Sequence, residues 1–119
     1  MDFNSVQKRK LAFVLWTLFI AVVTLTPLPA GGPAAPATQV DKIAHFALFF
    51  IFAFLAARIR GARTWENYLL IIAAAVAYGG LIEYLQLYVP GRESDMLDIV
   101  ADALGALSLC IMAPTVLKK

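Results

Sequence analysis

The chain has 119 residues, which is enough for one domain at most. Apolar residues make up 61% of it and charged residues only 15%, a composition that excludes a soluble globular protein and predicts an integral membrane protein. The net charge of +2 is too small to indicate a nucleic-acid partner. The one cysteine, Cys110, excludes an internal disulfide and a cysteine-based metal cluster.

Four apolar segments predict an all-α bundle of four transmembrane helices. The first covers about residues 11–28 and follows three basic residues, Lys8 to Lys10. Its 18 uncharged residues are enough for one crossing of a bilayer. A basic start before an apolar run is also typical of a signal peptide, here with cleavage near Ala30. The run is longer than such peptides usually have, so we interpret it as a retained helix.

The other three helices are predicted over about residues 43–59, 68–89 and 97–117. The segment 27–40 contains four prolines, so we expect an external loop there. Asp41 suits the first turn of the second helix, where an acid interacts favourably with the helix dipole. A Pro90-Gly91 turn separates the last two helices, and Ser94 or Asp95 is the expected N-cap of the fourth.

The basic residues predict the orientation of the bundle. Four crossings place both termini on one side, together with the loop between the second and third helices. Eight of the ten Lys and Arg residues fall on that side, namely Lys8, Arg9, Lys10, Arg58, Arg60, Arg63, Lys118 and Lys119. Only Lys42 and Arg92 fall on the other. Since positive loops stay in the cytoplasm, we predict cytoplasmic termini and outward-facing loops at 27–42 and 90–96.

Polar side chains recur near the predicted outward ends of the second, third and fourth helices. Their spacing is i,i+4, i,i+3 and i,i+3,i+7, in the sets Asp41 and His45, Glu83 and Gln86, and Asp95, Asp98 and Asp102. Each set therefore lies along one helical face. Ionisable groups that face lipid are costly, so we expect these faces to converge inside the bundle. Close approach of the backbones there is expected at Gly79, Gly80 and Gly105.

A polar pocket in the outer leaflet is the functional interpretation of this pattern. Histidine changes charge near neutral pH, and carboxylates can act as bases. The candidate catalytic residues are therefore His45, Glu83 and Asp98. The candidates for binding a substrate or its phosphate are Lys42, Arg92 and Gln86, and those in supporting positions are Asp41, Asp95 and Asp102. Carboxylate oxygens are also ligands for hard divalent cations, which leaves a metal cofactor open.

A purely structural network is the alternative interpretation. Ion pairs such as Glu83–Arg92 or Asp98–Lys42 would then only hold the helices together, with His45 bonded to a carbonyl group. We favour the functional pocket, because structural pairs rarely need this many buried acids.

Two segments of the chain resemble the VanZ-like family of small membrane proteins, namely DKIAHFALFF (41–50) and YGGLIEYLQLYVPGRESDMLDIVADALGA (78–106). The resemblance lies in the combination DK-x-x-HF, E-x-x-Q, GR-x-x-D-x-x-D and a later Gly. The matching positions are Asp41, Lys42, His45, Phe46, Glu83, Gln86, Arg92, Asp95, Asp98 and Gly105. Asp102 departs from the pattern, since many relatives have Asn there.

The resemblance implies one multi-span domain over residues 1–119, in the bacterial plasma membrane. The family's founding member is linked to teicoplanin resistance. We therefore expect a protein that binds or processes an anionic lipid or cell-envelope precursor headgroup. The alternative is a non-catalytic accessory protein that binds an envelope component or a partner membrane protein, so enzymatic activity stays open. An ion path is disfavoured, because the first helix has no ionisable residue and the inner halves of the helices are apolar.

Overall fold

The computed structural model describes residues 4–26, 37–60, 64–91 and 94–116, without the side chains of 37–41, 60 and 114–116. These residues form four α-helices and no strand, in the order α1 (Ser5–Leu25), α2 (Ala37–Arg60), α3 (Trp65–Gln86) and α4 (Met96–Val116). The predicted all-α class is confirmed.

Three of these helices contain a stretch long and apolar enough to cross a membrane. The stretches are Lys42–Ile59 in α2, Trp65–Gln86 in α3 and Met96–Ala113 in α4. Within the described residues α1 has no such stretch, because Lys8, Arg9 and Lys10 occupy its first turns. The crossing predicted over 11–28 also extends past the end of α1 at Leu25 and includes residues 27 and 28, which the structure does not describe.

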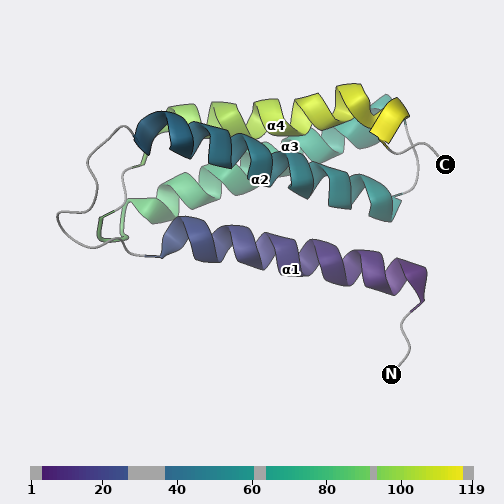
Figure 1. Cartoon of the computed structure of the whole chain (residues 1–119), viewed down its shortest axis with the longest axis horizontal. Coiled ribbons are helices and arrows are strands. Elements are labelled where there is room, and N and C mark those ends of the chain that lie inside the picture. The colour runs from purple at the N-terminus through teal and green to yellow at the C-terminus, as the bar shows by residue number, and fades with distance from the viewer. Residues whose placement is uncertain (1–3, 27–36, 61–63, 92–93, 117–119) are drawn as a thin grey trace.

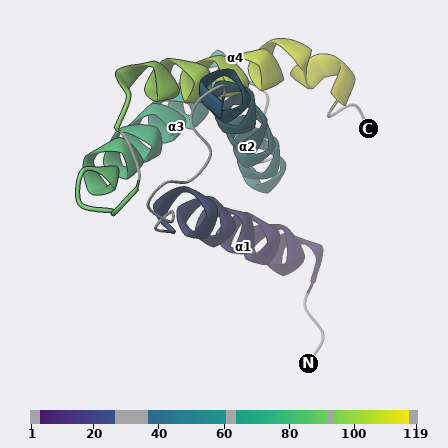
Figure 2. The same ribbon diagram turned by 60° about the vertical axis from the view of Figure 1, so that its left-hand side comes forward.

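The helices lie side by side, with α1 on one side of α2 and α3 and with α4 on the other (Figures 1 and 2). The start of α1 and the end of α4 lie at the same end of the molecule (Figure 1). The packing of α2 against α4 is the most extensive, and α1 packs against α2 and α3. Trp16 ties α1 to α2, since its Nε1 donates to the carbonyl oxygen of Leu48 at 2.9 Å.

The interior and the outer surface are both apolar. Fully buried side chains include those of Ile20, Phe49, Ile82 and Leu109. Large apolar side chains also cover the outside, for example Leu15, Leu18, Leu70, Leu81 and Ile111, each more than half exposed. An apolar exterior of this extent is what a lipid environment requires and what water disfavours.

Close approaches were expected at three glycines, and the structure shows them at two. A Cβ atom on Gly105 would collide with the α2 backbone, reaching 3.0 Å from the nitrogen of Phe50. A Cβ atom on Gly79 would collide with the Asp102 carboxylate, 3.2 Å from its Cγ. Gly80 faces open space, so the expectation for this position is wrong. Gly105 therefore lets α4 approach α2, and Gly79 makes room for a buried acid.

Two helix boundaries differ from the predicted ones in ways that affect the polar residues. Helix α2 begins at Ala37 rather than near residue 43, because no proline interrupts the segment from Ala37 to Arg60. Asp41 therefore lies beyond the first turn of α2, which contains no acid. Helix α3 ends at Gln86 rather than near residue 89, and a turn containing Gly91 with a φ of 81° follows. Glu83 thus lies in the last turn of α3.

Candidate functional site

Six polar side chains are buried in the described part of the chain, and all lie at one end of the helices. They are Thr24, His45, Glu83, Gln86, Asp98 and Asp102, each at most 4% exposed. Thr24 comes from the end of α1, His45 from the start of α2, Glu83 and Gln86 from the end of α3, and Asp98 and Asp102 from the start of α4. The structure therefore brings together the side chains that the spacing predicted to converge.

His45 lies between two carboxylates of α4. Its Nδ1 is 2.8 Å from Oδ1 of Asp102, and its Nε2 is 3.6 Å from Oδ2 of Asp98. The first distance is that of a hydrogen bond and the second is longer than one. The Asp102 carboxylate thus accepts a hydrogen bond from Nδ1 and fixes the orientation of the ring, with Nε2 toward Asp98. The structural alternative expected a carbonyl partner for His45, and the structure shows a carboxylate at Nδ1.

Lys42 joins the same two helices through an ion pair with two acids. Its Nζ lies 2.7 Å from Oδ2 of Asp95 and 2.7 Å from Oδ1 of Asp98. The Asp98–Lys42 pair is the one that the sequence offered for a structural network. The side chain of Lys42 is 23% exposed, so it lies at the edge of the cluster that the buried polar side chains form. The ammonium group is already neutralised by carboxylates, which leaves it less available to a phosphate than the sequence suggested.

Asp95 lies at the start of α4, outside its apolar stretch. Its Oδ1 accepts from the backbone nitrogen of Leu97 at 2.9 Å, which makes Asp95 the N-cap of α4. The Lys42 ammonium, together with the Leu97 N–H group, lowers the pKa of the Asp95 carboxyl below its ordinary value. Asp95 is therefore held as a carboxylate by its neighbours.

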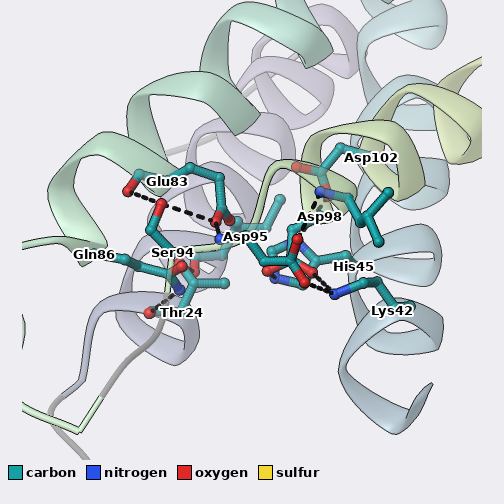
Figure 3. Close-up of polar contacts among 11 residues, drawn as sticks. Thr24, Lys42, His45, Glu83, Gln86, Ser94, Asp95, Asp98 and Asp102 are labelled. Atoms are coloured by element: carbon teal, nitrogen blue, oxygen red, sulfur yellow. Dashed lines mark hydrogen bonds and ion pairs between the residues drawn. The ribbon is translucent and has the colours of Figure 1, made fainter. Parts of the chain in front are cut away.

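Glu83 is held through one of its two carboxylate oxygens. Its Oε1 accepts from the backbone nitrogen of Asp95 at 2.7 Å and from Oγ of Ser94 at 3.5 Å. Ser94 also donates to the backbone carbonyl oxygen of Glu83 at 2.9 Å. The second oxygen, Oε2, is buried and has no hydrogen-bond partner among the described residues. Figure 3 shows Glu83 and Ser94 on one side of Asp98, and Lys42 and His45 on the other.

Gln86 connects the cluster to α1. It is 3% exposed, and its Nε2 donates to the carbonyl oxygen of Thr24 at 2.8 Å (Figure 3). Its Oε1 is buried without a hydrogen-bond partner among the described residues. Gln86 was predicted to bind substrate, and its amide nitrogen is instead used within the protein.

Two contributions to the site were missed in the sequence. Ser94 was expected only as a helix cap, yet it clamps the turn before α4 onto Glu83. Thr24 contributes its backbone carbonyl group, which accepts from Gln86. A serine that follows a turn is a weak indication of such a hydrogen bond. The sequence does not indicate which backbone carbonyl group will accept from a distant side chain.

Two predicted site residues lie outside what the structure describes. Arg92 falls in the gap at 92–93, and the side chain of Asp41 is not described although its backbone belongs to α2. The proposed roles of Arg92 in phosphate binding and in a Glu83–Arg92 ion pair therefore stay predictions.

Three of the buried residues are spaced for a metal ion. One ligand atom each from His45, Glu83 and Asp98 lies within 4.8 Å of the other two. The same three residues were the predicted catalytic candidates. The arrangement offers an oriented imidazole beside carboxylates, which suits proton transfer, and a nitrogen and two oxygens, which suits a divalent cation.

The comparisons with known proteins agree with the resemblance in the motifs. The sequence model described as VanZ/LLP1 matches residues 3–117. An uncharacterized protein of the fission yeast Schizosaccharomyces pombe is 28% identical over 102 residues, which cover 85% of this chain and 60% of the yeast protein. The chain thus spans about 60% of the length of this curated relative. No solved structure matches significantly.

The yeast relative shows that sequences similar to this one are not confined to bacteria. Residence in the bacterial plasma membrane is therefore a proposal, whereas helices apolar enough to span a membrane are observed in the structure. With a match that covers nearly the whole chain, the protein belongs to the VanZ/LLP1 family.

Proposed function

We propose that this protein crosses the plasma membrane with both termini in the cytoplasm, and that its buried polar cluster binds and processes the headgroup of an anionic lipid or lipid-linked envelope precursor. The observation that carries the proposal is the convergence of buried His45, Glu83, Asp98 and Asp102 from three helices. Removing ionisable groups from water costs several kcal/mol each, by rough estimate, and apolar residues would pack the helices as well. Burial of so many therefore favours a use beyond packing.

The charges at the two ends of the helices support the proposed orientation. At the end opposite the cluster, Lys8, Arg9 and Arg58 line a cavity of about 240 Å³ between α1 and α2. The cluster contains four carboxylates and Lys42 (Figure 3). Because basic residues favour the cytoplasmic side, the acidic end is proposed to lie in the outer leaflet.

The geometry favours separate positions for the phosphate and for the other groups of the headgroup. A phosphate is repelled by carboxylates, so it would bind at the edge of the cluster, where Arg92 follows the turn in the sequence and where Lys42, although paired with Asp95 and Asp98, is partly exposed. Hydroxyl or amine groups of a headgroup would donate to the acids. Asp102 orients His45, which is the arrangement that a general base needs in order to take a proton from a hydroxyl group.

A non-catalytic accessory role is the second candidate, and one observation favours it. The contacts Lys42–Asp95, Asp95–Glu83 and Gln86–Thr24 use much of the cluster's polar capacity within the protein. A site of this kind can recognise an envelope component or a partner membrane protein without turning it over. Release of product from a bound lipid separates the two candidates, because only the first predicts it.

Lipid retention in native mass spectrometry tests the proposal. Protein purified in detergent would be offered phosphatidylglycerol, a polyprenyl phosphate or phosphatidylcholine. We expect selective retention of the anionic lipids, lost in His45→Ala and Glu83→Gln. Glu66→Gln is the matched control, because Glu66 lies in the first turn of α3, at the other end of the helix that carries Glu83. Equal retention by all variants and all lipids would contradict the proposal.

Glycopeptide resistance is a separate expectation that comes from the founding family member. Expression in a teicoplanin-susceptible host, compared with expression of the His45→Ala variant, measures whether this chain shares it.

A further inference from the structure

We propose that His45, Glu83 and Asp98 bind one divalent metal ion that accepts both nitrogen and oxygen ligands, such as Zn²⁺ or Mn²⁺. The inference concerns the site of the proposed function and rests on that function for its biological purpose. Its geometry stands independently, because it follows from how the three side chains are held. With a metal bound, Nε2 of His45 would be a ligand and could not also act as the general base, so proton transfer would fall to one of the acids.

The three side chains come from three different helices and meet in the interior. They are 2%, 3% and 1% exposed in the order His45, Glu83, Asp98. Their ligand atoms lie within 4.8 Å of one another. Two ligands on opposite sides of an ion at about 2.1 Å are about 4.2 Å apart, so small inward movements would bring all three to bonding distance.

His45 and Asp98 are each anchored through one atom and direct a second one inward. Nδ1 of His45 is bonded to Asp102, and Oδ1 of Asp98 is paired with Lys42. The other atoms of the two groups, Nε2 and Oδ2, then face each other at 3.6 Å. A carboxylate on the far nitrogen of a histidine is the usual partner of a metal-binding imidazole, since it fixes the tautomer and raises the basicity of the ligand.

Glu83 provides an independent observation that points to a ligand. Its Oε1 is occupied by the backbone N–H of Asp95, whereas its Oε2 is buried and has no hydrogen-bond partner among the described residues. A buried carboxylate oxygen without a partner is unfavourable. A cation shared with His45 and Asp98 would satisfy it, and nothing else described in the cluster does so.

The charge of the cluster also requires compensation. Four carboxylates, those of Glu83, Asp95, Asp98 and Asp102, stand against the Lys42 ammonium among the described side chains. With all four acids ionised and a neutral imidazole, the net charge of these side chains is −3, and a divalent ion would reduce it to −1. Buried charge of one sign is unfavourable unless it is paired or bound to a metal.

The ligand set indicates the class of metal. Mg²⁺ and Ca²⁺ prefer oxygen ligands alone, whereas Zn²⁺ and Mn²⁺ accept imidazole nitrogen together with carboxylate oxygen. One nitrogen and two oxygens also leave coordination positions open, as a site that works on a substrate requires. A proton held between His45 and the acids is the competing explanation, and it predicts no metal.

The metal content of the purified protein tests the proposal directly. Full-length protein in detergent would be treated with EDTA, dialysed against ZnCl₂ or MnCl₂ at limiting concentration, and examined by elemental mass spectrometry. We expect about one ion per chain in the wild type and in Glu66→Gln, and at least about a tenfold loss of affinity in Glu83→Gln and His45→Gln. Asp102→Ala should weaken binding by about 10–100-fold, because it removes the group that orients the ligand. Equal content in all five proteins would overturn the site.

A second measurement uses the wild type alone, so that the test does not depend on the folding of Glu83→Gln. A metal that binds only the folded protein raises its melting temperature with increasing concentration. We expect ZnCl₂ or MnCl₂ to do so after EDTA treatment, and MgCl₂ to do so much less. An unchanged melting temperature with both transition metals overturns the proposal.

Lipid retention distinguishes failure of this inference from failure of the proposed function. If the protein retains a polyprenyl phosphate but binds no metal, the metal site is wrong and the function stands. If it binds one metal ion but retains no anionic lipid in either metal state, the function is wrong and the metal site stands.

Discussion

Nδ1 of His45 and Oδ1 of Asp102 are 2.8 Å apart in the interior of the bundle, and neither side chain is more than 3% exposed. The pair links α2 to α4 and sets the direction of the imidazole ring. Its environment is tight, because the Asp102 carboxylate lies against Gly79 of α3. One carboxylate therefore holds a candidate base and contacts a third helix.

Asp102→Asn tests whether the His45–Asp102 pair requires a negative charge at position 102 or only a hydrogen-bond acceptor. The amide keeps an oxygen that can accept from Nδ1 of His45, so we expect the free energy of unfolding to fall by less than about 1 kcal/mol and lipid retention to persist. Asp102→Ala leaves a buried donor unsatisfied and should lower the free energy of unfolding by about 1–3 kcal/mol. Chemical denaturation in detergent measures both. Equal effects of the two substitutions would show that the hydrogen bond does not matter.

Two glycines provide a matched test of the packing. Gly105→Ala places a methyl group against the α2 backbone at Phe46 and Phe50, which should lower the free energy of unfolding by about 1–3 kcal/mol. Gly80→Ala adds the same group in open space within a helix and should be neutral or raise it by up to about 1 kcal/mol. Thermal unfolding measures the difference, and a destabilised Gly80→Ala protein would contradict the assigned packing of α3.

Acid should weaken the contact between Lys42 and Asp95. The Lys42 ammonium lowers the pKa of Asp95 in the folded protein, so the pair adds stability above the ordinary aspartate pKa of about 3.9, and this contribution is lost as the pH falls through the lower folded value. We expect wild type to melt above Asp95→Asn at pH 6 and the two melting temperatures to converge toward pH 3. A constant difference over that range would exclude the ion pair as its origin.

Thiol labelling tests the proposed orientation. In a Cys110→Ala background, Tyr88→Cys and Thr64→Cys place single thiols at exposed positions on opposite ends of α3. An impermeant maleimide added to intact cells should label the first protein and not the second until the cells are opened. The reverse pattern would place the polar cluster on the cytoplasmic side.

The sequence predicted the convergence of the polar residues because helical spacing limits which side chains share a face. Glu83 and Gln86, and Asp98 and Asp102, could be assigned to common faces without coordinates. Burial of ionisable groups in an apolar chain then required these faces to meet. The family motif selected the same residues, so two independent arguments agreed on His45 and Glu83.

The details that the sequence did not yield depend on rotation and on distant contacts. Gly79 and Gly80 are neighbours, and only the rotation of α3 decides which one faces Asp102. The sharing of Lys42 between Asp95 and Asp98 depends on the crossing of α2 and α4, which no local pattern specifies. The early start of α2 at Ala37 was missed because proline content dominated the interpretation of the preceding segment.

Photo-crosslinking with a polyprenyl phosphate analogue tests the central claim most directly. The reactive group would be attached at the phosphate, and the labelled residues would be mapped by peptide mass spectrometry. We predict labels at the start of α2 and α4, around Lys42 and Asp95, that are lost in Glu83→Gln and kept in Glu66→Gln. Labelling only around the basic cavity of Lys8, Arg9 and Arg58 would contradict the account, because it would place the headgroup at the opposite end of the helices.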